Sequence, residues 1–146
     1  MLYGSNKNLR IGRYSESGYV YHVVFSTLNR SSTLSCFKKA RTIIKHLSAS
    51  DSSGFTETLS FCVMPDHVHW LFKLHKGELS NNIQRVKANC SRELAVKLWN
   101  KSFYDHAIRS DESLINVARY IVANPLRAGL VKSVRDYPHW DSIWLK

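Results

Sequence analysis

The spacing of apolar and polar residues along the chain predicts four strands. Residues 19–25 are β-branched and aromatic almost throughout, which is typical of a strand buried within a core. Residues 56–64 and 67–74 carry apolar side chains at alternate positions and are separated by a Pro-Asp turn, so they are expected to form a hairpin. A short fourth strand is expected over 103–108.

Three helices are predicted between and after these strands. Residues 34–47 and 79–99 repeat apolar side chains at helical spacing, and 48–54 is predicted to be the loop that follows the first of them. The last helix is expected over 111–124 and is expected to stop at Pro125, because proline disfavours a helical residue before it. The buried stripe of the first helix is predicted to be Phe37, Ala40, Ile44 and Leu47.

This order of elements, β-α-β-β-α-β-α, predicts an α+β protein. Its first six elements match a ferredoxin-like antiparallel β-sheet with helices packed on it, and the seventh is an extra C-terminal helix. A chain of 146 residues with 44% hydrophobic and 22% charged residues is expected to fold as one domain over 1–146. Residues 1–18 are expected to form a basic N-terminal arm, and 132–146 a tail anchored by aromatic side chains. Those anchors are Tyr137, Trp140 and Trp144.

The charge of the chain indicates a polyanionic partner. Lys and Arg number 21 against 11 Asp and Glu, a net charge of +10 with histidine neutral. Nucleic acid is the simplest explanation of such an excess, and a merely soluble basic protein is the alternative. The candidate nucleic-acid contacts are Arg10, Arg13, Tyr14, Lys38, Arg41, Lys45 and Arg127. For each of them a solvated surface position is the alternative.

The cysteines and the hydropathy of the chain indicate the cellular compartment in which it is expected. Cys36, Cys62 and Cys90 are odd in number and far apart, so they form neither a CxxC zinc knuckle nor a disulfide framework. Free thiols are typical of a reducing compartment. The sequence has no apolar run near the ~18 residues that cross a bilayer, and its first segment, MLYGSNKNLR, lacks the apolar stretch of a signal peptide. A cytoplasmic protein without membrane contact is expected.

Two histidines on the third predicted strand are candidate metal ligands. Side chains two residues apart on a strand point to the same side, so His67 and His69 project together. Val68 and Trp70 then face the core. Imidazole is the commonest metal-binding side chain in proteins. Hydrogen-bonded histidines of the surface or core are the alternative, and the pair alone does not decide between them.

The last helix carries a second candidate group. Tyr120 and Asn124 are four residues apart and are therefore neighbours on one flank of the helix. The alternative is a boundary tyrosine and an asparagine that ends the helix. His22 on the first strand could approach the histidine pair, but without a named partner it is assigned a structural role.

Four segments of the sequence closely resemble one known family. They are MPDHVHW at 64–70, ARYIVANPLRAGLV at 118–131, LRIGRYS at 9–15 and DYPHWDSIW at 136–144. Together they resemble the REP-associated tyrosine transposases, which are HUH single-strand nucleases and relatives of the smallest insertion-sequence transposases. The resemblance covers about residues 9–145. Its specific part is His-Val-His after Met-Pro-Asp, followed some fifty residues later by Tyr-x-x-x-Asn-Pro.

The resemblance implies an activity and a set of residues. It implies a single HUH transposase-like domain whose C-terminal helix carries the catalytic tyrosine, Tyr120. His67 and His69 would be metal ligands and Asn124 a third, amide ligand, for Mg²⁺ or Mn²⁺. Such enzymes cleave and rejoin single-stranded DNA at hairpin-forming REP-like palindromes through a covalent phosphotyrosine intermediate. Relatives act as monomers or as homodimers that donate the tyrosine helix in trans, and both possibilities stay open.

These residue types suit that chemistry. Attack on a phosphodiester needs a nucleophile, and Tyr120 supplies a phenol whose usual pKa near 10 requires a nearby cation for activation. Two neutral imidazoles and an amide leave a divalent ion its full charge, and nitrogen ligands favour Mn²⁺ over Mg²⁺. Because a phosphotyrosine conserves the phosphodiester energy, a 3′-hydroxyl can reverse the step. Strand transfer is therefore expected rather than digestion.

Two other functions compete with this one. A catalytically silent, domesticated palindrome-binding module would hold DNA without cutting it, although the intact His-Val-His and Tyr120 argue against it. An RNA-binding sheet would need exposed aromatic residues on a strand of the Gly-Phe-x-Phe type, and the sequence has no such strand.

Overall fold

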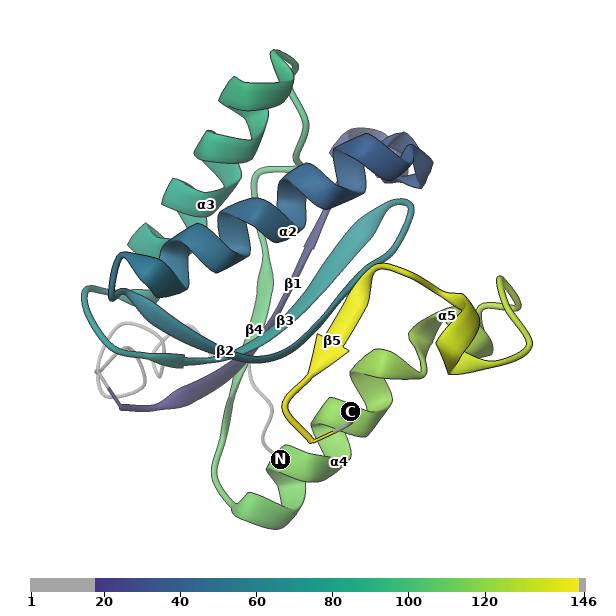
Figure 1. Cartoon of the computed structure of the whole chain (residues 1–146). Coiled ribbons are helices and arrows are strands. Elements are labelled where there is room, and N and C mark those ends of the chain that lie inside the picture. Colours follow the sequence, from purple (N-terminus) through teal and green to yellow (C-terminus); the bar gives the residue numbers. More distant parts are fainter. Residues whose placement is uncertain (1–17, 145–146) are drawn as a thin grey trace.

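A five-stranded antiparallel sheet forms the centre of the molecule, in the order β4-β1-β3-β2-β5 (Figure 1). The computed structural model describes residues 18–144. The strands are β1 (Val20–Ser26), β2 (Thr56–Val63), β3 (His67–Leu74), β4 (Tyr104–Ile108) and β5 (Trp140–Ser142). The helices are α2 (Phe37–Ser52), α3 (Leu79–Leu94), α4 (Asp111–Val122) and α5 (Asn124–Arg127). Short 3₁₀ turns are η2 (Leu28–Arg30), η3 (Thr33–Ser35) and η4 (Val134–Asp136).

The first four strands have the ferredoxin-like arrangement predicted from the sequence. β1 lies between β3 and β4, β3 lies between β1 and β2, and every pair is antiparallel. The crossover helices α2 and α3 cover one face of the sheet, and α4 covers the other (Figure 1). The predicted α+β class and the extra helix after the fourth strand are therefore confirmed.

The C-terminal tail adds a strand that the sequence pattern did not predict. Trp140 of β5 pairs with Cys62 of β2, so the tail covers the edge that β2 would otherwise expose. The Tyr137 hydroxyl donates a hydrogen bond to the carbonyl oxygen of Val63. Trp144, expected to be a third anchor, is exposed.

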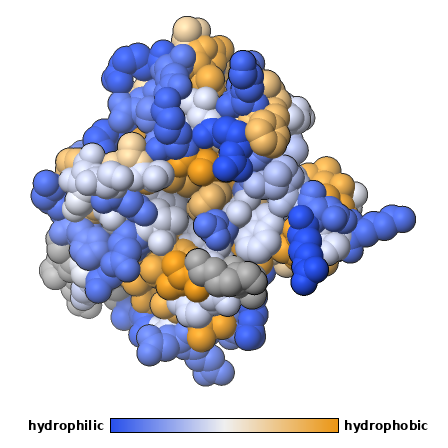
Figure 2. Space-filling model, viewed as in Figure 1, coloured by the Kyte–Doolittle hydropathy of each residue, from blue (hydrophilic) through white to orange (hydrophobic). Residues whose placement is uncertain are grey.

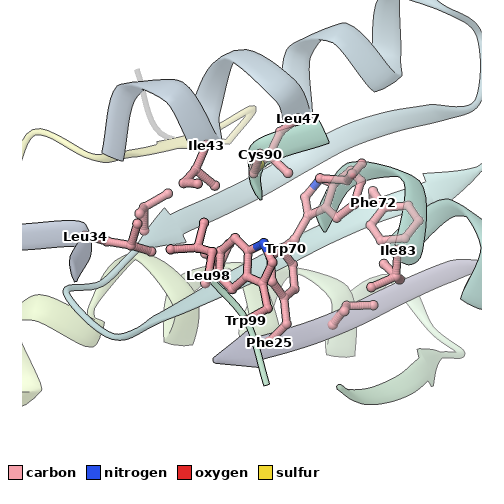
Figure 3. Close-up of a cluster of buried hydrophobic side chains, with 14 of the residues drawn as sticks. Phe25, Leu34, Ile43, Leu47, Trp70, Phe72, Ile83, Cys90, Leu98 and Trp99 are labelled. Atoms are coloured by element: carbon pink, nitrogen blue, oxygen red, sulfur yellow. The ribbon is translucent and has the colours of Figure 1, made fainter. Parts of the chain in front are cut away.

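The larger core lies between the sheet and the helices α2 and α3. Val68, Trp70 and Phe72 alternate along β3 and are fully buried on this side. Figure 3 shows Phe25 next to Trp99, with ring centroids 4.9 Å apart, and Trp70 next to Phe72, with centroids 4.1 Å apart. Since β3 residues alternate between faces, this core directs the intervening histidines to the opposite face.

A smaller core holds α4 against that opposite face. Ala118 and Ile121 of α4 pack with Leu71 of β3 and Cys62 of β2, and all four are buried. Burial of this stripe determines how α4 is rotated about its axis. It therefore also determines where Tyr120 lies.

The helix α2 is longer than the apolar spacing predicts. The predicted loop over 48–54 is wrong for 48–52, which are helical. Ser50 and Thr56 hydroxyls lie 2.8 Å apart, and the Asp51 carboxylate accepts a hydrogen bond from Thr56 Oγ1 at 2.7 Å. The polar last turn of α2 therefore has hydrogen-bond partners on β2. The spacing of apolar residues cannot predict such contacts.

The buried stripe of α2 also differs from the prediction at its first residue. Phe37 is 59% exposed, and Ile43 is buried in the core instead. The Phe37 ring contacts His139 of the tail, with centroids 5.0 Å apart. Phe37 is the first residue of the helix, and the buried residues of α2 begin at Ala40.

Two helix ends also depart from the predicted boundaries. The helix predicted over 79–99 ends at Leu94, because Ala95 adopts a left-handed conformation with φ 56°. Pro125 does not end the helical segment but lies in the first turn of α5, where a missing N–H is tolerated. Asn124 is therefore the first residue of α5 rather than the last of α4.

Hydrophilic side chains cover most of the face seen in Figure 2, with apolar patches between them. Among the described residues, no helix is long and apolar enough to cross a bilayer.

The three cysteines are expected to differ sharply in reactivity. Cys36 is exposed, and the backbone N–H of Lys39 lowers the pKa of its thiol. Burial raises the pKa of Cys62 and of Cys90 to about 12. Titration with a disulfide reagent at pH 8 should therefore find one fast thiol in the folded protein and three in denaturant. Cys36→Ser should remove the fast reaction, and more than one fast thiol in the folded protein would contradict the burial of the other two.

Candidate functional site

The face of the sheet beneath α4 carries a pair of histidines. His67 and His69 come from β3 and point to the same side, as their spacing predicts. Their ring centroids are 5.0 Å apart with 70° between the planes. The exposed fraction of the His67 side chain is 16%, and His69 is almost fully buried. Two imidazoles at this separation can bind one ion between them.

The orientation of His67 depends on the residue before it. Its Nδ1 lies 2.7 Å from Oδ1 of Asp66, whose Oδ2 accepts a hydrogen bond from Nε of Arg30 at 3.1 Å. Burial alone would raise the pKa of Asp66, but hydrogen bonds from His67 and Arg30 outweigh it and lower this pKa. The ionised carboxylate therefore accepts from Nδ1–H of His67, and in the neutral ring Nε2 is then the lone-pair nitrogen.

His69 has a different partner. Its Nδ1 lies 3.0 Å from Nε2 of His22, on the neighbouring strand β1. Burial lowers the pKa of both His22 and His69. The neighbouring His22 ring lowers the pKa of His69 further. Both rings are therefore neutral near pH 7. Within the described residues no hydrogen bond occupies Nε2 of either His67 or His69.

Tyr120 extends from α4 toward this pair. Its ring centroid is 6.1 Å from that of His69, with 75° between the planes. The buried neighbours Ala118 and Ile121 hold the helix, while Tyr120 itself is 52% exposed. A phenol in this position is accessible to a large substrate and lies within the same chain as the histidines.

Arg127 lies over the ring of Tyr120. Its guanidinium carbon lies 3.8 Å from the centroid of the Tyr120 ring, a cation–π contact. Arg127 is the last residue of α5, which follows α4 closely along the chain. Its charge also acts on His69 and lowers the pKa of that ring further. The candidate site thus holds a cation as well as a phenol and two imidazoles.

Asn124 has a polar group suited to a ligand. Its side chain is partly exposed, yet the amide Nδ2 is buried and has no hydrogen-bond partner among the described residues. Amide nitrogen and oxygen are assigned from the hydrogen-bond network, and here no partner fixes them. A buried amide end without a partner fits a role as a third ligand beside two imidazoles.

The basic stripe of α2 lies elsewhere. Lys38, Arg41 and Lys45 are on a helix that covers the opposite face of the sheet. Lys45 Nζ pairs with Glu93 at 2.8 Å, and Arg41 donates to the carbonyl oxygen of Pro138 at 3.1 Å. The structure therefore separates these three residues from the histidines and Tyr120. The remaining predicted contacts, Arg10, Arg13 and Tyr14, lie outside the described residues.

Several residues of the site were not singled out by the sequence. Asp66 and Arg30 support His67, and His106 of β4 lies against His22 with ring centroids 5.1 Å apart. Asp66 directly precedes the His-Val-His motif, and this position could have identified it as a partner of His67. The roles of Arg30 and His106 follow from strand pairing and loop packing, which one sequence does not reveal.

Comparison with known proteins identifies the family of the chain. A profile of the family described as "Transposase IS200 like" matches residues 15–124, which include both histidines, Tyr120 and Asn124. The chain belongs to the IS200-like transposase family. The match covers most of the chain, and the predicted relationship to tyrosine transposases is confirmed.

Two curated proteins are similar to this IS200-like chain. One, from Haemophilus influenzae, is provisionally named a REP-associated tyrosine transposase and is 30% identical over 100 residues, 57% of each chain. The REP-associated tyrosine transposase of Escherichia coli is 31% identical over 85 residues, 56% of this chain and 52% of its own. The chain thus spans about half the length of the curated relatives that it matches.

A solved structure has the same fold. It is a REP-associated tyrosine transposase bound to a REP hairpin, with a TM-score of 0.77 and 23% identity. The superposition covers 88% of this IS200-like chain and 79% of the other. At this identity the likeness supports the fold.

Proposed function

We propose that this IS200-like chain cleaves and rejoins single-stranded DNA at hairpin-forming, REP-like palindromes through a covalent bond to Tyr120. The observation that carries the proposal is the contact between Tyr120 and the histidine pair within one chain, with ring centroids 6.1 Å apart at His69. The net charge of +10 suits a polyanionic substrate. The relatives named as REP-associated tyrosine transposases, one of them bound to a REP hairpin, support this class of substrate.

The covalent step follows from the chemistry of a phenol. The Tyr120 oxygen attacks phosphorus, a P–O bond to the tyrosine forms, and the bond to the 3′ oxygen of the preceding nucleotide breaks. The products are a 5′-phosphotyrosine and a free 3′-hydroxyl, so no phosphodiester energy is lost to water. A second 3′-hydroxyl can then attack the same phosphorus and release the tyrosine. The phenol proton passes to solvent, since Tyr120 is 52% exposed, and the departing 3′ oxygen takes up a proton from solvent.

Three side chains fit a divalent ion. Nε2 of His67 and of His69 carry no hydrogen bond within the described residues, and the amide of Asn124 has a buried end without a partner. These ligands would hold Mn²⁺ or Mg²⁺ and leave it uncompensated charge. When bound, such an ion supplies Lewis acidity at the scissile phosphate. The ionised Asp66 makes the His67 nitrogen a stronger donor.

The test uses a synthetic hairpin with a single-stranded flank, labelled at its 3′ end. With Mn²⁺ the label should move to the protein band on a denaturing gel, because the 3′ fragment stays attached through its 5′ phosphate. Addition of a strand with a free 3′-hydroxyl should then move the label from the protein band into a DNA product longer than the labelled 3′ fragment. Binding without an adduct under either ion would support a silent palindrome-binding module, and cleavage without an adduct would support a simple hydrolase.

Arg127 is expected to stabilise charge at the reacting phosphate. Its guanidinium lies over the Tyr120 ring and can donate to a phosphate oxygen bound beside that ring. Arg127→Ala should slow adduct formation about 100-fold, as for removal of one donor to a developing oxyanion. Arg127→Lys should be intermediate, because it keeps the charge but loses the planar contact.

The control for this prediction is Arg119→Ala. It removes a charge of the same kind one residue before Tyr120, on another side of α4. Single-turnover rates of adduct formation separate the two variants. Equal, small effects of both substitutions would mean that Arg127 contributes only general electrostatic attraction.

A further inference from the structure

A buried histidine of β1 makes direct contact with the candidate site. Nε2 of His22 lies 3.0 Å from Nδ1 of His69. The two rings are stacked, with centroids 5.2 Å apart and 21° between the planes. His22 is 5% exposed and His69 6% exposed, so this hydrogen bond is shielded from water.

The register of the sheet creates this contact. Pairing of β1 with β3 places His22 opposite Leu71, so His69 is its diagonal neighbour on the same face. Pairing of β1 with β4 places His106 opposite His22, with the two rings edge to face at 5.1 Å. His22 is therefore held between His69 on one side and His106 on the other.

The contact restricts how His69 can bind an ion. A neutral imidazole has one N–H and one lone-pair nitrogen. Since Nδ1 of His69 is engaged by His22, Nε2 is the nitrogen that remains for an ion. Nε2 has its lone pair only when the proton is on Nδ1, and Nδ1–H must then donate to Nε2 of His22.

We propose that His22 is a positioning residue that accepts a hydrogen bond from Nδ1 of His69 and so holds Nε2 of that ring toward the metal. The inference rests on the proposed function, because it concerns a ligand of the same site. The two ligands are then oriented by different groups, an ionised carboxylate for His67 and a neutral imidazole for His69. His22 does not reach the substrate and acts through His69.

The first test compares two substitutions at this position. His22→Gln keeps a hydrogen-bond acceptor near the place of Nε2, whereas His22→Leu removes it. The Mn²⁺ dissociation constant, measured from the electron paramagnetic resonance signal of free Mn²⁺, should rise about 10- to 100-fold for Leu. For Gln it should stay near the wild-type value. Wild-type affinity in the Leu variant, or equal losses in both variants, would overturn the inference.

A packing control separates orientation from stability. Val23 lies next to His22 on the same strand, but its side chain is buried in the core on the opposite face. The control variant is Val23→Ala. It should lower the melting temperature and leave the Mn²⁺ dissociation constant unchanged. An equal loss of Mn²⁺ affinity in the Val23 variant would mean that a packing defect alone accounts for the His22 effect, which would also overturn the inference.

The second test distinguishes failure of the inference from failure of the proposed function. Nitrogen-15 NMR of the metal-free protein reports the tautomer of His69 directly. We expect the Nδ1–H tautomer in wild type and a shift toward Nε2–H in His22→Leu. The Nε2–H tautomer in wild type would contradict the inference even if Mn²⁺ binds. A wild-type protein with the expected tautomer that binds no Mn²⁺ would support the hydrogen bond and contradict the metal role in the proposed function.

Discussion

We expect Tyr120→Phe to abolish the covalent protein–DNA adduct and to leave DNA binding at the wild-type level. This is the largest effect that we expect. The substitution removes the phenol oxygen and keeps the ring that contacts His69 and Arg127. Loss of a nucleophile in other enzymes lowers the rate by at least about 10⁴-fold. The measurement is the fraction of labelled hairpin retained by the protein on a denaturing gel, with binding followed separately by gel shift.

Tyr19→Phe is the matched control. Tyr19 is also exposed, but it precedes β1, whereas His67 pairs with Ser26 at the other end of that strand. The control should form the adduct at the wild-type rate. An undiminished adduct in Tyr120→Phe would refute the assignment of the nucleophile, whatever the control does.

The same variant decides whether the site is completed within one chain. In the structure Tyr120 lies beside His69 of its own chain. A mixture of Tyr120→Phe with His69→Ala should therefore remain inactive, because neither chain holds a complete site. Recovery of adduct in the mixture would mean that the tyrosine helix acts in trans between two subunits.

Replacement of either candidate ligand should remove Mn²⁺ binding and adduct formation together. His67→Ala and His69→Ala each delete one of two imidazoles that point to the same region of the sheet face. We expect Mn²⁺ affinity to fall below detection in calorimetry and adduct formation to fall at least about 10²-fold. Hairpin binding should persist, since the basic surface is intact.

The two ligand variants should differ in stability. His69 is almost fully buried and bonded to His22, so His69→Ala leaves a buried nitrogen without a partner and should cost about 1–3 kcal/mol in the free energy of unfolding. His67 is nearer the surface, and Asp66 keeps Arg30 when His67 is lost. Thermal melts should therefore rank His69→Ala below His67→Ala. His75→Ala, which removes an exposed histidine paired with Glu57, is the control for both. Wild-type Mn²⁺ affinity in either ligand variant would exclude that residue from the metal site.

The spacing of apolar residues predicted the parts of this fold that depend on residues close together in the sequence. The alternation of β3 placed Val68 and Trp70 in the core, and the same alternation turned His67 and His69 to the other face. It failed where a polar segment found its partners elsewhere in the chain. The last turn of α2, around Asp51, is helical because hydrogen bonds tie it to β2.

The chain by itself determined the residue types of the candidate site and the faces on which they lie. Strand period and helix period follow from local backbone geometry, so His67, His69 and Tyr120 could each be placed on an element from their spacing alone. The tertiary structure decided which of these residues meet. Strand register brought His22 to His69, and packing of α2 on the far face kept its basic stripe away. Such contacts depend on pairings between residues tens of positions apart, which local periodicity does not encode.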